Sequence, residues 1–317
     1  TRVAILDMQN NFAFPIENFE LTLANNPKSL NQLLDLLKKY IQKSGIVKNK
    51  IVGIGIGMPG FVDIKKSINN TYLKPARGNV VSELESELGV PVFIDNDSSL
   101  VALAELKFGK ARNRKNSMVI NIGWGVGLGM ILNGELFRGN NGFAGEFSHI
   151  PIFTNNKICG CGKSGCLETE TSLLVIIDKA IKGIKEGKST SLKDISMDHP
   201  EAAAHSIIEA ALHGDSFSID LITEVGYNIG RGVAILIHIL NPELIVLSGR
   251  GSLAGRLWRA PIQQAINKLC IPKIAEDTTI EISQMNYQAE IIGTACLVMD
   301  QIDKRKFLLT HEKSLIS

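Results

Sequence analysis

Short runs of apolar residues alternate along this chain with longer segments whose apolar residues recur every three or four positions. The short runs are typical of buried strands and the longer segments of amphipathic helices. The expected strands are residues 3–6, 51–56, 92–94, 118–122, 130–132, 244–247 and 280–283. The expected helices are residues 29–43, 98–108, 173–185, 205–213, 216–240, 254–269 and 289–302. This alternation predicts an α/β protein whose sheets are covered by helices.

Length, charge and composition narrow this picture. A chain of 317 residues exceeds what one hydrophobic core usually organises, so we expect two lobes. The longest apolar run, residues 233–240, is far shorter than the roughly 20 residues of a membrane span. A formal net charge of +2 gives no indication of a nucleic-acid surface. The five cysteines show no disulfide-like framework, which favours a cytoplasmic location.

A cluster of three cysteines is the strongest chemical signal in the chain. Cys159, Cys161 and Cys166 lie close together, and His149 precedes them. Three thiolates and one imidazole complete a tetrahedral shell around zinc without a large core. Because protein atoms would fill all four positions, the expected zinc is structural and not hydrolytic. The alternative is a glycine-rich loop that carries reduced thiols.

Two acidic residues flank this cluster. Glu146 lies three residues before His149, and Glu168 lies two residues after Cys166. Zinc would hold both carboxylates in one place, and the imidazole would keep its second nitrogen for an outer partner or a ligand. Carboxylates beside an oriented imidazole suit a small molecule that is rich in hydroxyl groups. The alternative is that both acids are solvated loop residues.

A second acidic motif lies where a predicted strand meets a helix, at residues 94–99 (Ile-Asp-Asn-Asp-Ser-Ser). Strand ends in open α/β sheets commonly carry ligand-contacting side chains. Asp97 is well placed to accept a proton from a substrate hydroxyl, as a general base must. The competing interpretation is that Asp97 or Ser98 caps the helix that follows. The two roles are compatible.

Glycines also lie at the ends of two other predicted strands. Gly123, Gly125 and Gly127 alternate between two predicted strands, and such spacing lets backbone N–H groups approach a phosphate or another ligand. A glycine-rich hairpin without a ligand is the alternative. The pattern matches neither the mononucleotide P-loop nor the dinucleotide fingerprint. Gly249 lies in a turn after residues 245–248, which either presents backbone to a nucleotide or only links two elements.

In their order along nearly the whole chain, these motifs resemble the ROK family (repressors, open reading frames and sugar kinases). The resemblance rests on residues 57–60 with 62–63, 96–97 with 102–105, 123–129, 133–134, 144–149, 159–168 and 248–249. It implies an actin-like, two-lobed, ATPase-type α/β fold of the sugar kinase/Hsp70/actin superfold, with a zinc-binding loop. It also implies a smaller lobe of residues 1–97 with a returning helix at about 290–317. The larger lobe, residues 98–289, would carry the zinc loop and the dimerisation helices.

The resemblance also assigns roles to individual residues. Zinc would be held by His149, Cys159, Cys161 and Cys166. The expected sugar contacts are Asn96, Asp97, Glu146, His149 and Glu168. In the kinase members, the residue at the position of Asp97 is the catalytic base, which deprotonates the sugar hydroxyl that attacks the γ-phosphate of Mg-ATP. A nucleotide would contact Gly123, Gly125, Gly127 and Gly249. This nucleotide half of the site is where the sequence departs from the kinase pattern.

The departures are concentrated on the nucleotide side. Trp124 stands where kinase members usually have threonine, and Arg250 adds a side chain to a turn that is usually glycine only. Ser99 and Ser148 replace residues that are common in kinases. The first phosphate loop would lie before or at Thr1. The sugar and zinc half therefore keeps the family pattern, while the nucleotide half does not.

This asymmetry indicates the sugar-sensing effector part of a ROK transcriptional regulator of carbohydrate metabolism, with a sugar or sugar phosphate as ligand. We expect a homodimer or a dimer of dimers that contacts DNA through an N-terminal winged helix-turn-helix absent from this chain, with no membrane partner. The alternative is an ATP-dependent ROK sugar kinase, similar to glucokinase or an N-acetylhexosamine kinase, with Asp97 as general base. A non-catalytic sugar-binding partner that does not contact DNA is a third hypothesis.

Overall fold

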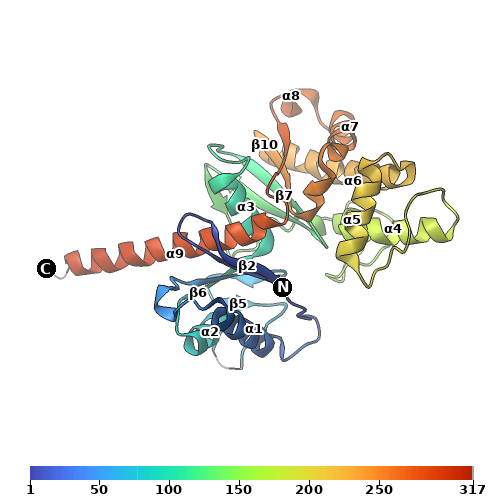
Figure 1. Cartoon of the computed structure of the whole chain (residues 1–317). Helices are drawn as coiled ribbons and strands as arrows, with labels where there is room; N and C mark the ends of the chain where they lie inside the picture. The colour runs from blue at the N-terminus through green and yellow to red at the C-terminus, as the bar shows by residue number, and fades with distance from the viewer. Residues whose placement is uncertain (77, 316–317) are drawn as a thin grey trace. The chain divides into compact units, whose positions relative to one another are not determined.

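A computed structural model describes residues 1–76 and 78–315, and the side chains of residues 1–76 and 78–303 (Figure 1). The chain forms two compact units. Unit 1 comprises Thr1–Lys107, Arg138–Ala144 and the chain from Gln288 onward, and unit 2 comprises Phe108–Phe137 and Gly145–Tyr287. The lobe boundaries expected from the sequence, at residue 97 and near 290, stay a prediction. Residues 316 and 317, with which the smaller lobe was expected to end, lie outside the described residues.

The described residues of unit 1 form three small strand pairs and four helices. The antiparallel pairs are β1 (Arg2–Leu6) with β2 (Phe12–Asn18) and β4 (Val62–Asp63) with β5 (Ile68–Asn69), and β3 (Ile54–Met58) pairs in parallel with β6 (Val92–Asn96). The helices are α1 (Ser29–Ser44), α2 (Val80–Leu88), α3 (Asp97–Phe108) and α9 (Gln288–Leu315), and Lys48–Lys50 form a 3₁₀ turn. Leucines of α1 and α2 pack against β3 and β6 in one hydrophobic core, so the helical periodicity near residue 30 marks buried positions.

Unit 2 is built on a five-stranded sheet in the order β11-β10-β7-β8-β9. The strands β7 (Ser117–Ile122), β10 (Leu244–Ser248) and β11 (Thr279–Ile282) are parallel, whereas β8 (Val126–Leu132) and β9 (Glu135–Phe137) continue the sheet as antiparallel hairpins. Every residue of β7 and β10 is buried. Their near-continuous apolar sequence is therefore typical of strands covered on both faces.

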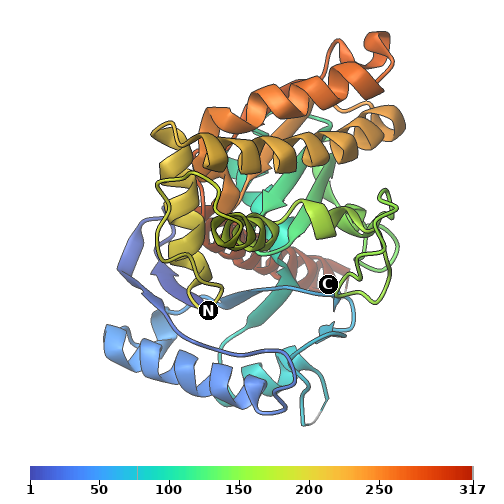
Figure 2. The same ribbon diagram turned by 90° about the vertical axis from the view of Figure 1, so that its right-hand side faces the viewer.

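The helices of unit 2 are α4 (Leu173–Lys185), α5 (Pro200–Leu212), α6 (Ser216–Leu240), α7 (Arg259–Leu269) and the short α8 (Pro272–Ala275). Helices α4, α5 and α6 pack on one another, and α6 and α7 lie side by side in both views (Figure 1 and Figure 2). The sheet and these helices share the larger hydrophobic core. Among the described residues, no helix has both the length and the apolar character needed to cross a bilayer.

The sequence located the long helices and the buried strands, and it missed one long strand, β2, and several short elements. Strands β2, β4, β5 and β9 and helix α2 were not expected. The expected helix at 254–269 is wrong in its first part, because residues Arg250–Trp258 form 3₁₀ turns and α7 begins only at Arg259. Gly255 has a φ of 56° inside this segment, a left-handed conformation that interrupts a right-handed helix.

Candidate functional site

The acidic motif of unit 1 lies at the junction of β6 and α3, as the sequence indicated. Asn96 Oδ1 accepts hydrogen bonds from the backbone N–H groups of Ser98 at 2.9 Å and Ser99 at 3.3 Å. Asp97 Oδ1 accepts a hydrogen bond from the Ser98 N–H at 2.7 Å. Both side chains thus satisfy N–H groups in the first turn of α3, so the capping interpretation describes their local contacts. Asp97 remains partly accessible, and its role as a base stays a prediction.

Beside this motif, unit 1 contains a cavity that the sequence did not reveal. Asn96 Nδ2 donates a hydrogen bond to Gly60 O at 3.2 Å, and Gly60 immediately precedes the cavity-lining Phe61. The cavity has a volume of about 620 Å³ and is lined by Phe61, Asp63, Lys65, Lys66, Asn70, Asn140, Asn141 and Phe143. The rings of Phe61 and Phe143 meet edge to face at 5.7 Å. Its walls come from two segments far apart in sequence, so no local pattern could have indicated the cavity.

The cysteine cluster of unit 2 forms as the sequence predicted. The ligand atoms of His149, Cys159, Cys161 and Cys166 all lie within 4.8 Å of one another. The cysteines lie on a short segment that folds back on itself. Isolated antiparallel β-bridges join Ile158 to Ser164 and Pro151 to Cys166. His149 ends the 3₁₀ turn Phe147–His149, and the 3₁₀ turn Leu167–Glu170 directly follows Cys166.

Two of the distances between ligand atoms of the cluster match those of a tetrahedral zinc shell. Two sulfurs about 2.3 Å from zinc lie about 3.8 Å apart at the tetrahedral angle, and a sulfur and a nitrogen lie about 3.6 Å apart. The Cys161 Sγ to Cys166 Sγ distance is 3.7 Å, and the Cys159 Sγ to His149 Nδ1 distance is 3.5 Å. Three thiols and one imidazole are also the donors that zinc prefers. These residues therefore fit the ion.

The thiols of the cluster differ in their acidity. Burial raises the pKa of the Cys159 thiol to about 12 and also raises the pKa of Cys166. The backbone N–H of Lys163 lowers the pKa of Cys161, which is the exposed thiol of the three. Since a metal binds the thiolate, a metal that enters this cluster must displace protons from the buried thiols.

The two flanking acids lie at the cluster. His149 Nε2, the nitrogen that does not face Cys159, is 3.6 Å from Glu146 Oε2. Burial raises the pKa of Glu146; the nearby His149 opposes this effect, and the charge of Glu168 adds to it. Glu168 Oε1 is 3.7 Å from Cys159 Sγ. Unit 2 therefore holds two carboxylates and one imidazole around the cluster, a set that can accept and donate hydrogen bonds to hydroxyl groups.

Glu168 also explains one glycine of the β7–β8 hairpin. Its Oε2 accepts a hydrogen bond from the Val126 N–H at 3.3 Å. A Cβ atom on Gly125 would lie only 2.6 Å from the same oxygen. Gly125 is thus required for the close approach of the Glu168 carboxylate, whereas the proposed contact of Gly123, Gly125 and Gly127 with a nucleotide stays a prediction.

Two of the departures from the kinase pattern, Trp124 and Arg250, contact each other. Strands β7 and β10 run in parallel with Asn121 opposite Ser248, so the turns that follow them are neighbours. The Arg250 guanidinium lies over the Trp124 ring, 5.2 Å from its centroid, a cation–π contact. The other side of Arg250 faces α5, where its Nε is 3.3 Å from Glu201 Oε2. Gly249 leaves no room for a side chain, since its Cβ would overlap Asn121 Oδ1.

Helix α6 supports the cluster from behind. Phe147 and Leu167, from the two 3₁₀ turns that carry His149 and Glu168, are buried against this helix. A Cβ on Gly232 would lie 2.6 Å from Leu167 Cδ2 and 2.7 Å from Phe147 Cε2. Sequence reasoning missed this contact, because a glycine inside a helical pattern does not reveal which side chains pack on it.

Solved structures that superpose on this chain include a transcriptional regulator and sugar kinases. A ROK family transcriptional regulator, described as a homologue of the Escherichia coli MLC protein, superposes with a TM-score of 0.79 at 28% identity, over 95% of this chain and 76% of that chain. A ROK family glucokinase from Streptomyces griseus, in complex with glucose and AMPPNP, superposes with a TM-score of 0.77 at 23% identity, over 92% of this chain and 93% of that chain. The fold and the Cys/His cluster define an α/β protein of the actin-like sugar-kinase fold.

The family model described as ROK family matches residues 17–301, so the chain belongs to the ROK family. Its curated relatives include both functional branches. A glucokinase from Halalkalibacterium halodurans is 33% identical over 276 residues, which cover 85% of this chain and 82% of the relative. A xylose repressor from Caldicellulosiruptor bescii is 32% identical over 282 residues, which cover 87% of this chain and 69% of the relative.

Proposed function

We propose that this chain is the sugar-sensing effector part of a ROK transcriptional regulator of carbohydrate metabolism. The ligand is a sugar or sugar phosphate, and the residues that we propose for binding its hydroxyl groups are Asn96, Asp97, Glu146, His149 and Glu168. The regulator acts in the cytoplasm, where its thiols stay reduced, and binds DNA as a dimer or a dimer of dimers through an N-terminal winged helix-turn-helix.

In this proposal, zinc is a structural ion held by His149, Cys159, Cys161 and Cys166. When bound, it fixes the geometry of its four ligands and supplies no reacting group. The residues themselves make the sugar site. His149 keeps Nε2 turned toward Glu146, whose Oε2 is 3.6 Å away, and this contact orients both side chains for a hydroxyl ligand.

The observation that carries the regulator hypothesis is the contact between Trp124 and Arg250 at the ends of β7 and β10. Ligands of open α/β sheets bind outside the carboxyl ends of parallel strands. An indole and a guanidinium occupy that edge here, 5.2 Å apart. Arg250 also pairs with Glu201, which offsets part of the positive charge that a phosphate would otherwise meet. A sugar sensor does not need open space for the phosphates of a nucleotide, whereas a kinase does.

The second candidate is an ATP-dependent ROK sugar kinase with Mg-ATP as co-substrate and Asp97 as general base. The 33% identity to a glucokinase and the Asn96-Asp97 pair at the start of α3 favour it. In this case, Asp97 accepts the proton of the attacking hydroxyl, and the glycines of the β7–β8 hairpin and Gly249 approach the nucleotide.

A coupled assay of ADP release, run across common hexoses and N-acetylhexosamines, separates the two candidates. The regulator hypothesis expects sugar binding by calorimetry without turnover. Sustained ADP release that disappears in Asp97→Asn would contradict it and establish the kinase. The coding sequence upstream of Thr1 is a second test, because a winged helix there supports the regulator.

A further inference from the structure

Residues 154–164, the loop that carries Cys159 and Cys161, are exposed except for Cys159. Cys161 is exposed, and Ile158, its largest apolar side chain, is 74% exposed. Backbone hydrogen bonds close the loop internally, for example from the Cys159 N–H to Lys163 O at 2.8 Å. Such bonds set the shape of the loop but do not attach it to the rest of unit 2.

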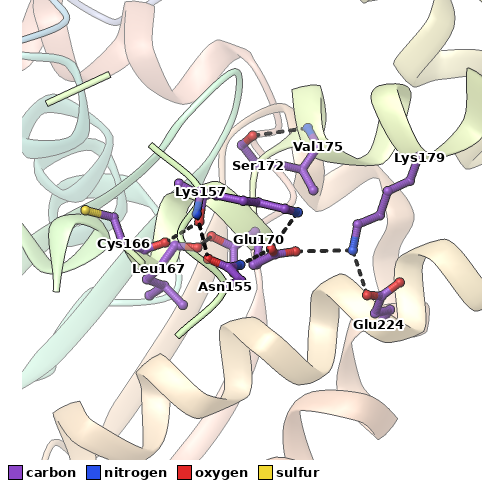
Figure 3. A network of polar contacts seen from close by, with 11 residues as sticks. Asn155, Lys157, Cys166, Leu167, Glu170, Ser172, Val175, Lys179 and Glu224 are labelled. Atoms are coloured by element: carbon purple, nitrogen blue, oxygen red, sulfur yellow. Dashed lines mark hydrogen bonds and ion pairs between the residues drawn. The ribbon is translucent and has the colours of Figure 1, made fainter. Parts of the chain in front are cut away.

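Part of that attachment is polar and is made through Glu170 (Figure 3). Glu170 ends the 3₁₀ turn that carries Glu168, and its side chain is only 9% exposed. It accepts a hydrogen bond from Asn155 Nδ2 and lies 2.6 Å from Lys157 Nζ. Asn155 and Lys157 enter the cysteine loop, so Glu170 joins the chain before the cysteines to the chain after them.

The same carboxylate reaches the helices of unit 2. Lys179 Nζ, from α4, lies 3.3 Å from Glu170 Oε2 and 2.6 Å from Glu224 Oε1, which belongs to α6 (Figure 3). Glu170 and Lys179 are mostly buried, with side-chain exposures of 9% and 19%. A buried ion pair contributes little net stability, because desolvation offsets its attraction, but it fixes which groups meet.

We infer that Glu170 is a positioning residue that links the cysteine loop, through Lys157 and Lys179, to helices α4 and α6. It holds Cys159 and Cys161 beside Cys166 before a metal binds, which lowers the ordering cost of forming the site. It also fixes the turn that carries Glu168, so sugar affinity depends on it as well. The inference rests on the proposed zinc and sugar site and adds the residues that preorganise it.

The test compares Glu170→Gln and Lys157→Met in the full chain. Zinc affinity is measured by competition with a chromogenic chelator, and sugar affinity is measured by calorimetry on the zinc-loaded protein. We expect zinc affinity to fall about tenfold in each variant, similar to the loss of an outer partner of a metal ligand. The double variant should lose little more than either single variant, because both changes break one linkage.

A general charge effect on the zinc ion predicts a different result. Removing the negative charge of Glu170 weakens the attraction for Zn²⁺, and removing the positive charge of Lys157 weakens the repulsion. The two variants would then shift zinc affinity in opposite directions. Lys163→Met, at an exposed lysine of the same loop, is the matched control and should leave affinity within twofold of the unaltered chain. Lys157 is 51% exposed, so Lys157→Met leaves no cavity in the core. This variant therefore still tests the inference if Glu170→Gln fails to fold.

Opposite shifts, unchanged affinity in Lys157→Met, or an equal loss in Lys163→Met would each overturn the inference. These outcomes are distinct from a failure of the proposed function. In that case the unaltered chain itself binds neither zinc nor any sugar tested.

Discussion

At the scale of single residues, the four members of the cysteine cluster differ in accessibility. Cys159 and Cys166 are buried, whereas Cys161 is exposed. A substitution at Cys161 therefore removes one donor without opening a cavity, and its effects report on the metal site and not on packing. Trp124 and Arg250 are partly buried, and Trp124 packs against the core of unit 2.

We predict that Cys161→Ser lowers zinc affinity by more than about 100-fold, because a direct ligand matters more than an outer partner. Sugar affinity should fall with it, since zinc fixes His149 next to Glu146. Metal content by elemental analysis and calorimetry with sugars measure both effects. Ser164→Ala, at an exposed position of the same loop, is the control. Normal zinc content together with normal sugar affinity in Cys161→Ser would contradict the proposed site.

The contact between Trp124 and Arg250 gives a second prediction. The double variant Trp124→Thr/Arg250→Ala should gain affinity for Mg-ATP, by about tenfold or ~1.4 kcal/mol, because it clears the edge at the ends of β7 and β10. Calorimetry with a non-hydrolysable ATP analogue measures the gain. Arg259→Ala, at an arginine that pairs with Glu281, should change nothing. If the double variant gains no affinity, this contact is not what excludes nucleotides.

At the scale of elements, the candidate site of unit 2 depends on helix α6 and the two 3₁₀ turns packed against it. The helix is 25 residues long and is capped by Asp215, whose side chain accepts a hydrogen bond from the Ser218 N–H at 2.8 Å. Its position is thus well defined, and Gly232 is the point at which the turns approach its backbone. The positions of both turns therefore depend on this helix.

Gly232→Ala tests that dependence. An alanine is the better helix former by about 1 kcal/mol. However, its Cβ would meet Leu167 and Phe147 at 2.6 and 2.7 Å, so the packed turns must move. We expect a net loss of about 1–3 kcal/mol of stability and weaker sugar binding. Denaturant unfolding and calorimetry measure the two effects. Thr223→Ala, at an exposed position of α6, should be neutral or slightly stabilising; a stabilised Gly232→Ala would contradict the packing argument.

The linkage at Glu170 predicts a specific pH dependence. Burial raises the pKa of Glu170, but the hydrogen bond from Lys157 and the charges of Lys179 and Lys157 outweigh it and hold the pKa below its ordinary value of 4.5. The charged form is therefore favoured in the folded state. Its contribution to stability is complete above that ordinary value and is lost as the pH falls through the lowered, folded-state pKa.

The stability difference between the unaltered chain and Glu170→Gln should therefore be constant near neutral pH and shrink on acidification. Denaturant unfolding at a series of pH values measures this difference. A difference that stays constant below the folded-state pKa, or that grows on acidification, would show that the charge of Glu170 is not what links the loop to α4.

At the scale of the whole molecule, the described part of the chain contains two separate hydrophobic cores. One lies in unit 1 and includes leucines of α1 and α2, and the other lies in unit 2 and surrounds β7 and β10. All four cluster ligands belong to unit 2. A bound ion stabilises only the unit that binds it, by mass action.

We therefore predict that heat unfolding departs from a single two-state transition and that a zinc chelator lowers the transition of unit 2 more than that of unit 1. Differential scanning calorimetry with and without chelator measures the transitions, and hydrogen exchange assigns each to its unit. Calorimetry of Cys161→Ser without chelator is the control and should reproduce the chelated profile. One transition that moves as a whole would mean that the two cores unfold together.

The sequence by itself determined the long elements, the α/β class and the members of the cysteine cluster. The reason is that these depend on local spacing. Periodicity marks a helix that packs on a core, and His149 to Cys166 lie close enough in sequence for one turn of chain to gather them. Short elements such as α2 and the two-residue strands carry too few apolar positions to form a pattern, so they were missed.

Only the tertiary structure decided which distant residues meet. Arg250 contacts Trp124 because β7 and β10 are neighbours in the sheet, although more than a hundred residues of chain separate them. Lys179 meets both Glu170 and Glu224 because α4 and α6 pack together, and Gly232 admits Phe147 and Leu167 for a similar reason. Such contacts follow from the order in which strands and helices pack, which local spacing does not encode.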